Sequence, residues 1–212
     1  MGAGGWVRLP RRDAGDKGGG LSYRLMDAYD AIHRRASVRS FRQAPVPRDA
    51  LERMLAAAVR APNHKLTEPW RFAVVAGESL RRYAEIRRAH RARKFDPADP
   101  AGAKAIEKTY REALDTPAFI VVMCAVSDDA VRREEDYAAT MMAVENILIA
   151  ARAEGLGTYL RTGGIMELPE VRELMRCPEG HRIVGIVSVG YPAAPGPPSR
   201  RTSAAEKAVW LD

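Results

Sequence analysis

The segment that most constrains the fold is the run 117–126, PAFIVVMCAV, the most hydrophobic stretch of the chain. A helix that crosses a membrane needs about 20 apolar residues, so this run is too short to span a bilayer. Its β-branched residues favour a strand over a helix, and a strand that is apolar throughout is typical of the buried centre of a sheet. We therefore predict a central strand in a water-soluble protein without a membrane partner.

A second constraint is the long helix predicted over residues 133–154, which Gly155 is expected to terminate. Its second half, AATMMAVENILIAARAEG, is apolar on nearly every side. A helix on the surface of a small monomer has a single apolar stripe. This helix is therefore expected either in the core or in an extensive contact between subunits.

Apolar periodicity and Pro/Gly punctuation divide the rest of the sequence into short elements. We predict four or five strands and about six helices, which indicates one α+β or α/β domain over residues 22–212. Residues 1–21 contain seven glycines and no continuous apolar run, so we expect a flexible extension there. The further helices are expected near 25–36, 47–61, 77–93, 101–114 and after Pro169, and the further strands over 70–76 (as a buried strand), 158–160 and 183–189.

Composition excludes several classes of protein. Apolar residues make up 46% of the 212, enough for a sizeable core. Cys124 and Cys177 are the only cysteines and neither has metal-ligand spacing, so we expect no disulfide scaffold, no metal site and a reducing cytoplasmic environment. The net charge of +7 favours anionic partners. Basic clusters at 81–82, 87–88 and 91–94 share a predicted helix with glutamates, which favours a solvated face over a nucleic-acid groove.

Motifs that mark common nucleotide and hydrolase sites are missing from the sequence: no GxGxxG, P-loop, GxSxG or HExxH pattern occurs. With no evident nucleophile, an enzyme of this kind usually takes its reactive group from a cofactor. Polar and glycine-rich residues gather in four segments, 31–41 (AIHRRASVRSF), 60–72 (RAPNHKLTEPWRF), 155–164 (GLGTYLRTGG) and 189–201 (VGYPAAPGPPSRR).

Two of these segments suggest a ligand by their chemistry. Arginines and a serine in 31–41 lie where a helix is expected to end, and guanidinium forks with a hydroxyl can grip a phosphate. Basic residues at a helix end also simply complement the helix dipole. In 155–164 a predicted strand runs into a glycine pair, which lets a flat ligand approach the backbone.

Taken in this order, the four segments resemble the nitroreductase family of FMN-dependent oxidoreductases. Residues 31–41 match the family's AIxxRRSVRxF motif with Ala36 in place of the second arginine. Residues 61–72 match much of APSxxNxQPWxF, although Asn63, Leu66 and Glu68 stand where Ser, Asn and Gln are usual. The Asn-His-Lys stretch is similar to the PDHK loop of compact bacterial members. GxxxLRTG and the late GYP are also typical, so the resemblance covers about residues 22–201.

The resemblance implies a nitroreductase-like three-layer sandwich of α+β class, with a central, mostly antiparallel sheet flanked by helices. It implies a homodimer with two FMN sites at the subunit interface, in agreement with the broad apolar surface of helix 133–154. It also implies that no side chain is catalytic, because the reaction takes place at flavin N5.

Positions that match the family's motifs are the implied FMN ligands. Arg161 is expected near the pyrimidine end of the flavin or, alternatively, in an interface salt bridge, and a backbone N–H of its turn is expected at N5. His64 is expected near the flavin or, alternatively, bonded to backbone. The implied phosphate and ribityl ligands are Arg35, Ala36, Ser37 and Arg39, with Arg200 or Arg201; those along the ring are Leu160, Arg161, Thr162 and Gly163, with Arg60 and His64 from the polar loop.

The implied function is an FMN-dependent oxidoreductase that uses NAD(P)H to reduce nitro compounds, quinones or similar electron-poor acceptors by a ping-pong hydride transfer. The alternatives are a flavin-binding protein without turnover and a basic nucleic-acid-binding protein. The physiological acceptor and the choice between NADH and NADPH stay open at this point.

Overall fold

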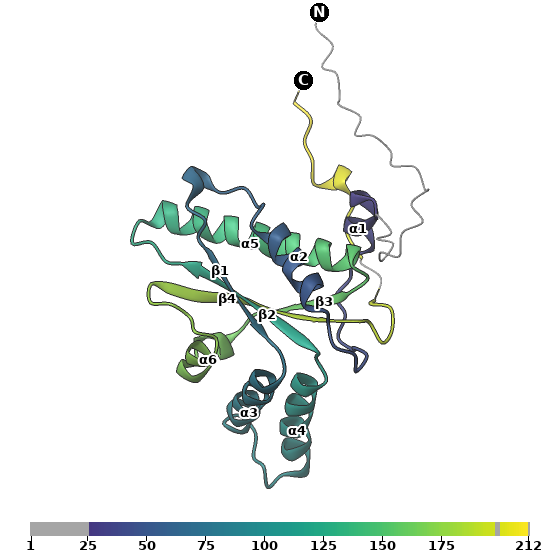
Figure 1. The fold of residues 1–212 in the computed structure, drawn as a ribbon, viewed down its shortest axis with the longest axis vertical. Helices are drawn as coiled ribbons and strands as arrows, with labels where there is room; N and C mark the ends of the chain where they lie inside the picture. Colours follow the sequence, from purple (N-terminus) through teal and green to yellow (C-terminus); the bar gives the residue numbers. More distant parts are fainter. Residues whose placement is uncertain (1–25, 198–199, 212) are drawn as a thin grey trace, which may run out of the picture.

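The computed structural model describes residues 26–197 and 200–211 of the 212-residue chain. The predicted extension at residues 1–21 lies outside the described residues. Within them, four strands and six α-helices form three layers, a helical layer on each face of one sheet (Figure 1). This arrangement confirms the predicted α+β sandwich.

The four strands pair in the spatial order β1-β2-β4-β3, and every neighbouring pair is antiparallel. All residues of β2 except the last are buried, which confirms the predicted central strand. The prediction of a buried strand over 70–76 is wrong, because β1 lies at the sheet edge with Arg71 and Val74 exposed. The strands are β1 (Trp70–Val75), β2 (Ala118–Ala125), β3 (Gly157–Arg161) and β4 (His181–Gly190).

Six α-helices cover the two faces of the sheet. One face carries α1 (Ala28–Arg34), α2 (Arg48–Ala58) and α5 (Ala130–Ala153), and the other carries α3 (Glu78–Ala92), α4 (Pro100–Leu114) and α6 (Pro169–Leu174) (Figure 1). Three short 3₁₀ helices, η1 (His64–Leu66), η2 (Gly164–Glu167) and η3 (Ala204–Glu206), lie in the connections. None of the helices in the described part of the chain is both long and apolar enough to cross a membrane.

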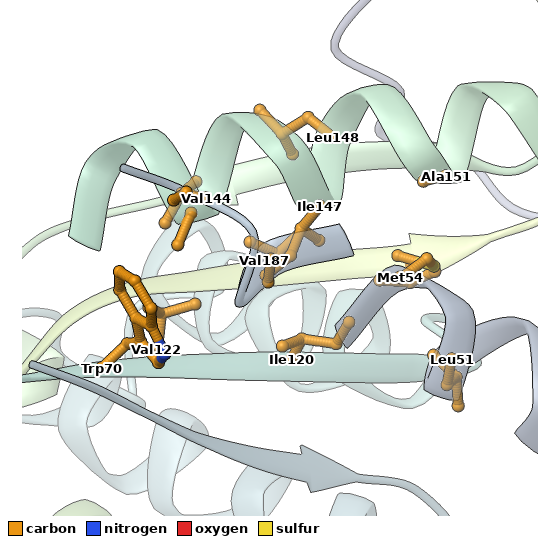
Figure 2. Close-up of a cluster of buried hydrophobic side chains, with 14 of the residues drawn as sticks. Leu51, Met54, Trp70, Ile120, Val122, Val144, Ile147, Leu148, Ala151 and Val187 are labelled. Atoms are coloured by element: carbon orange, nitrogen blue, oxygen red, sulfur yellow. The ribbon is translucent and has the colours of Figure 1, made fainter. Parts of the chain in front are cut away.

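Successive side chains of β2 point to opposite faces of the sheet, and both faces are covered, which explains why the sequence of this strand is apolar throughout. Ile120 and Val122 point to the α5 face, whereas Phe119 and Val121 point to the α3–α4 face, so both sets are buried. Figure 2 shows the first cluster, in which α5 and α2 cover the strands. Its central Ile147 is fully buried, and truncation of such a residue to alanine typically costs about 2–5 kcal/mol.

Helix α5 begins at the cap Asp129, whose carboxylate accepts a hydrogen bond from the Arg132 N–H at 2.9 Å. It ends before Gly155, which adopts φ +75° and so confirms the predicted stop. Tyr137 and Met142 of α5 remain partly exposed, and on the neighbouring α1 Tyr29 and Ile32 are 75% and 50% exposed. An apolar surface therefore remains uncovered on this layer.

Residues 37–42 extend the sheet beyond β3, a pairing that the sequence pattern did not predict. Ser37 forms a parallel bridge with Thr158, and the Val38 N–H donates to the Thr158 carbonyl at 2.8 Å. The Arg42 N–H donates to the Tyr191 carbonyl at 2.8 Å. Segments 31–41, 155–164 and 189–201 are thereby joined at one edge of the sheet.

Candidate functional site

Two cavities flank the joined segments. The first, of about 550 Å³, lies between helices α3 and α4 and the end of β3; the second, of about 480 Å³, lies between α1, the end of α5 and residues 192–196. Both volumes fall in the range of small-molecule sites. The consecutive residues Thr158 and Tyr159 line different cavities, so the start of β3 separates the two.

The first cavity contains the whole predicted ring-binding turn, residues 160–163. Gly163 has φ +133°, a conformation that other residues rarely adopt, and an added Cβ on Gly163 or Gly164 would meet nothing within 4 Å. Among the described residues, the N–H groups of Thr162 and Gly163 have no hydrogen-bond partner. The turn therefore offers two open donors and free space to a flat ligand.

Tyr159 brings two predicted ligands together. The guanidinium carbons of Arg39 and Arg161 each lie 4.8 Å from the centroid of its ring, and this geometry permits cation–π contact. The Arg161 Nε also donates to the Ser188 Oγ at 3.5 Å. Arg161 lines the first cavity, whereas the exposed Arg39 lines neither cavity and reaches this region only through its contact with the Tyr159 ring.

Arg35 is placed in the second cavity, where it and Ala36 are joined by Arg34, Arg42 and Arg152. The Arg35 Nε lies 3.7 Å from the Glu145 Oε1, and its side chain is only 19% exposed. The buried Arg152 Nε has no partner among the described residues. Of the predicted phosphate ligands, the structure thus places Arg35 and Ala36 at the second cavity, whereas Arg39 lines neither cavity and Ser37 forms the bridge to Thr158.

The fourth motif segment, residues 189–201, passes close to residues 36 and 37 of the first motif segment. A Cβ added to Gly196 would lie 2.8 Å from the Ala36 Cβ and 3.2 Å from the Ser37 carbonyl oxygen. Arg200 follows four residues later, a distance that an extended chain covers in at most about 14 Å. Arg200 and Arg201 are exposed and follow this contact closely in the sequence.

Arg60 and His64 line neither cavity. The His64 Nδ1 lies 2.9 Å from the Glu135 Oε2, so its partner is a carboxylate and not the backbone that we considered as an alternative. Glu135 and the Arg35 partner Glu145 stand ten residues apart on α5, about 15 Å along the helix. Within one chain, the polar loop and the β3 site are therefore separate.

The loop that carries His64 has a strained and well-anchored backbone. Lys65, Leu66 and Glu68 have φ values of 54°, 53° and 43°, which non-glycine residues seldom adopt and which gather at functional sites. The Thr67 hydroxyl donates to the carboxylate of the buried Asp136 at 2.6 Å. Sequence reasoning missed Thr67 and Asp136, because no local pattern links a loop to a carboxylate 69 residues away.

Sequence reasoning also misjudged part of the basic helix. Arg81, Arg82 and Arg88 are exposed as expected, but Arg87 is only 9% exposed and faces the first cavity. Burial, reinforced by the nearby cation Arg161, holds the pKa of Arg87 below its ordinary value. The cavity-facing residues Arg87, Arg91 and Lys94 recur at helical spacing, a signal that could have identified this face.

The two cysteines are not placed for catalysis. Cys124 is buried and Cys177 half-buried, and burial raises the pKa of both thiols. Within residues 26–197 and 200–211, no group of three or more metal-ligating side chains converges.

Comparison with known proteins gives a consistent result. A model of the nitroreductase family matches residues 32–191. YfhC of Bacillus subtilis, which is named as an NAD(P)H nitroreductase, is 32% identical over 77% of this chain and 83% of its own. YdjA of Escherichia coli, named likewise, is 34% identical over 79% of this chain and 89% of its own. The crystal structure of a nitroreductase-like family protein from Bacillus cereus superposes with a TM-score of 0.74 at 32% identity, covering 88% of this chain and 97% of that one.

Proposed function

Because the chain belongs to the nitroreductase family, we propose that it is an FMN-dependent oxidoreductase that uses NAD(P)H to reduce nitro compounds, quinones or similar electron-poor acceptors. The observation that carries this proposal is the joining of three motif segments at one sheet edge, between two cavities of ligand size. Each half of FMN finds suitable chemistry there.

The residues present fit the two ends of FMN. The open N–H groups of Thr162 and Gly163 and the space above Gly163 suit the edge of a flat ring. Arg35 and the free Nε of Arg152 suit a phosphate dianion in the second cavity, and the exposed Arg200 or Arg201 is close enough in sequence to add a third contact. The site would therefore hold the cofactor along β3 with Ser37 near its middle.

When bound, FMN supplies the two-electron chemistry, taking hydride from NAD(P)H and passing it to the acceptor in a ping-pong cycle. The protein's own role is to orient the flavin and the reactants and to compensate the negative charge that develops on the reduced flavin. The turn at Thr162 offers backbone donors to the ring edge, and Arg161, which lines the same cavity, places positive charge beside it. No acid–base side chain is required for this role.

We further infer that the working form is a homodimer in the cytoplasm, with each flavin site completed by the partner. Two observations support this: Arg60 and His64 lie apart from the β3 site of their own chain, and an apolar surface on α1 and α5 remains exposed. The anchored backbone at Thr67 suits a loop that must keep its shape when it is presented to another subunit.

The proposal is tested by the absorption spectrum of the purified protein, before and after anaerobic addition of NADPH or NADH. We expect a yellow protein with one FMN per subunit, bleached by the nucleotide and recoloured by a quinone. Yellow protein that is not bleached would indicate flavin binding without turnover. Colourless protein that takes up no FMN but binds DNA in a salt-sensitive way would instead support the nucleic-acid alternative.

A further inference from the structure

We propose that the first cavity selects negatively charged acceptors, namely flat molecules with one carboxylate, which the inward cations of α3, α4 and β3 recognise. This inference rests on the proposed function, because it names the class of acceptor that would meet the flavin. It is carried by three features of the cavity, which are its helical faces, its unpaired donors and its apolar floor.

The faces that α3 and α4 turn to the cavity are set by helical periodicity. On α3, residues Tyr83, Arg87 and Arg91 recur every four positions and therefore share one side of the helix, and Lys94 lines the cavity from the turn that follows α3. On α4, the lining residues Ala105, Lys108, Thr109 and Glu112 do the same. Residues 161–166 form the opposite wall. The hairpin thus holds its cations on a rigid frame facing the ring-binding turn.

The cavity contains more positive charge than the protein itself neutralises. Five permanent cations line it against one carboxylate, that of Glu112. The Arg87 Nη2 lies 3.9 Å from the Glu112 Oε2, too far for a hydrogen bond. No other described carboxylate forms a salt bridge with any of these cations, which are Arg87, Arg91, Lys94, Lys108 and Arg161.

Three residues that line this cavity each have a buried nitrogen atom without a hydrogen-bond partner among the described residues: the Arg87 Nη1, the His90 Nδ1 and the Arg91 Nε. An unpaired polar atom costs free energy when it is buried, and an unpaired charge costs more. Arg87 is more than nine-tenths buried, so water satisfies it poorly. An anion in the cavity would neutralise the excess charge that these partly buried cations bring.

The apolar side of the cavity defines the rest of the ligand. Ile165, Met166 and Ile186 line it next to the turn at residues 160–163. A flat apolar body would pack there, beside the proposed ring edge, while its charged group reaches the helix cations. These two requirements together describe an aromatic or enone carboxylate better than a neutral molecule or a bare inorganic anion.

The first experiment measures binding without turnover. The FMN-loaded, oxidised protein is titrated calorimetrically with benzoate and with its neutral analogue benzamide, in the absence of nicotinamide nucleotide. We expect benzoate to bind at least tenfold more tightly than benzamide, because hydrogen bonds to a charged group contribute more than neutral ones. Equal affinity of the two probes, or no binding of benzoate, would overturn the inference.

Variants then locate the binding. Arg87→Gln is expected to weaken benzoate binding about ten- to a hundredfold, and Lys94→Gln, at an exposed position of the same cavity, by a smaller factor. The matched control is Arg82→Gln, which removes an exposed cation from the same helix outside the cavity and should leave benzoate affinity unchanged. Lys94→Gln keeps the test decisive if Arg87→Gln does not fold. An equal loss in the Arg82 variant would indicate a general charge effect and contradict the proposal.

Steady-state kinetics separate the other candidates for the anion. The two acceptors compared are 4-nitrobenzoate, which is charged, and nitrobenzene, which is neutral. Arg87→Gln should raise the KM for 4-nitrobenzoate and leave the KM for nitrobenzene and for NADPH unchanged. A raised KM for NADPH would indicate that these cations bind a phosphate of the nucleotide. Equal weakening of FMN binding and riboflavin binding would indicate that they bind the flavin. Bleaching by NADPH without benzoate binding refutes only this inference, whereas benzoate binding by protein that takes up no FMN refutes the proposed function.

Discussion

At the scale of single residues, His90 shows how the first cavity controls protonation. Burial, together with the neighbouring cations Lys94 and Arg93, lowers the pKa of His90, and Glu170 opposes the shift only in part. The folded state therefore binds this proton less readily than the unfolded chain does. Above about pH 6.5, the ordinary pKa of histidine in the unfolded chain, His90 does not reduce the stability of the folded state. As the pH falls from this value through the lower pKa of the folded state, the free energy of unfolding decreases.

This shift predicts a pH-dependent affinity for anions. Bound benzoate would favour the protonated His90, so its affinity should rise as the pH falls towards the lowered pKa of His90 in the folded protein, as long as benzoate stays ionised. Calorimetric titrations at pH 7.5, 6.5 and 5.5 measure the effect. His90→Gln should remove most of the dependence, and a variant that retains it in full would show that another group titrates.

Arg35 and Arg39 are expected to act on different parts of FMN, although they stand four residues apart. Arg35 lines the second cavity with three further arginines, whereas Arg39 lines neither cavity and packs against the ring of Tyr159. Arg35→Ala should therefore weaken FMN binding about tenfold or more and riboflavin binding much less, because riboflavin lacks the phosphate. Arg39→Ala should weaken both to a similar extent. Fluorescence titration of the apoprotein distinguishes the two patterns, and identical patterns for both variants would refute the division.

At the scale of elements, the α3–α4 hairpin depends on one glycine. A Cβ added to Gly102, in the first turn of α4, would lie 2.1 Å from the backbone carbonyl oxygen of Asp96, and the Gly102 N–H donates to the cap Asp99 at 2.8 Å. Gly→Ala in a helix normally stabilises by about 0.5–1 kcal/mol. Here the sign should reverse, because backbone has to move to make room.

We therefore expect Gly102→Ala to lower the free energy of unfolding by about 1–3 kcal/mol, within the range for overpacking. Urea unfolding followed by circular dichroism gives the value. Ala103→Gly, at the next and exposed position, is the matched control and should cost only the helix-propensity difference of about 1 kcal/mol. A higher free energy of unfolding for Gly102→Ala would contradict this prediction and show that the turn at residues 96–99 moves aside at little cost.

Comparison of elements shows which features the sequence could predict. The helix expected over 101–114 is found at Pro100–Leu114, and the run 117–126 contains β2 at Ala118–Ala125, because each carries a strong local pattern. The edge position of β1 was not predictable, since an apolar run does not reveal how many neighbours a strand has. The motif segments identified the cofactor region, but which arginine faces which cavity depends on contacts between residues distant in the sequence, such as Val38 with Thr158.

At the scale of the whole molecule, the uncovered face of α1 and α5 predicts association. Ile32→Glu places a charge on this face, and desolvating it in a contact is unfavourable. If the wild type is the homodimer proposed above, the variant is expected to be a folded monomer that binds FMN much more weakly than the wild type, measured by sedimentation equilibrium and flavin fluorescence. Ala92→Glu, an exposed change on the opposite helical layer, should remain dimeric. A monomeric wild-type protein that retains FMN would contradict the shared site.

The pairing of residues 37–42 with residues 158 and 191–193 also sets an order of events during synthesis. The early arginines leave the ribosome long before their strand partners, about 120 and 150 residues later in the chain, have been translated. Closing such long intervals is entropically costly, so this edge of the sheet is expected to be among the last parts to form. A nascent chain halted before the final strand would therefore lack a complete cofactor site, and flavin uptake would report on finished chains alone.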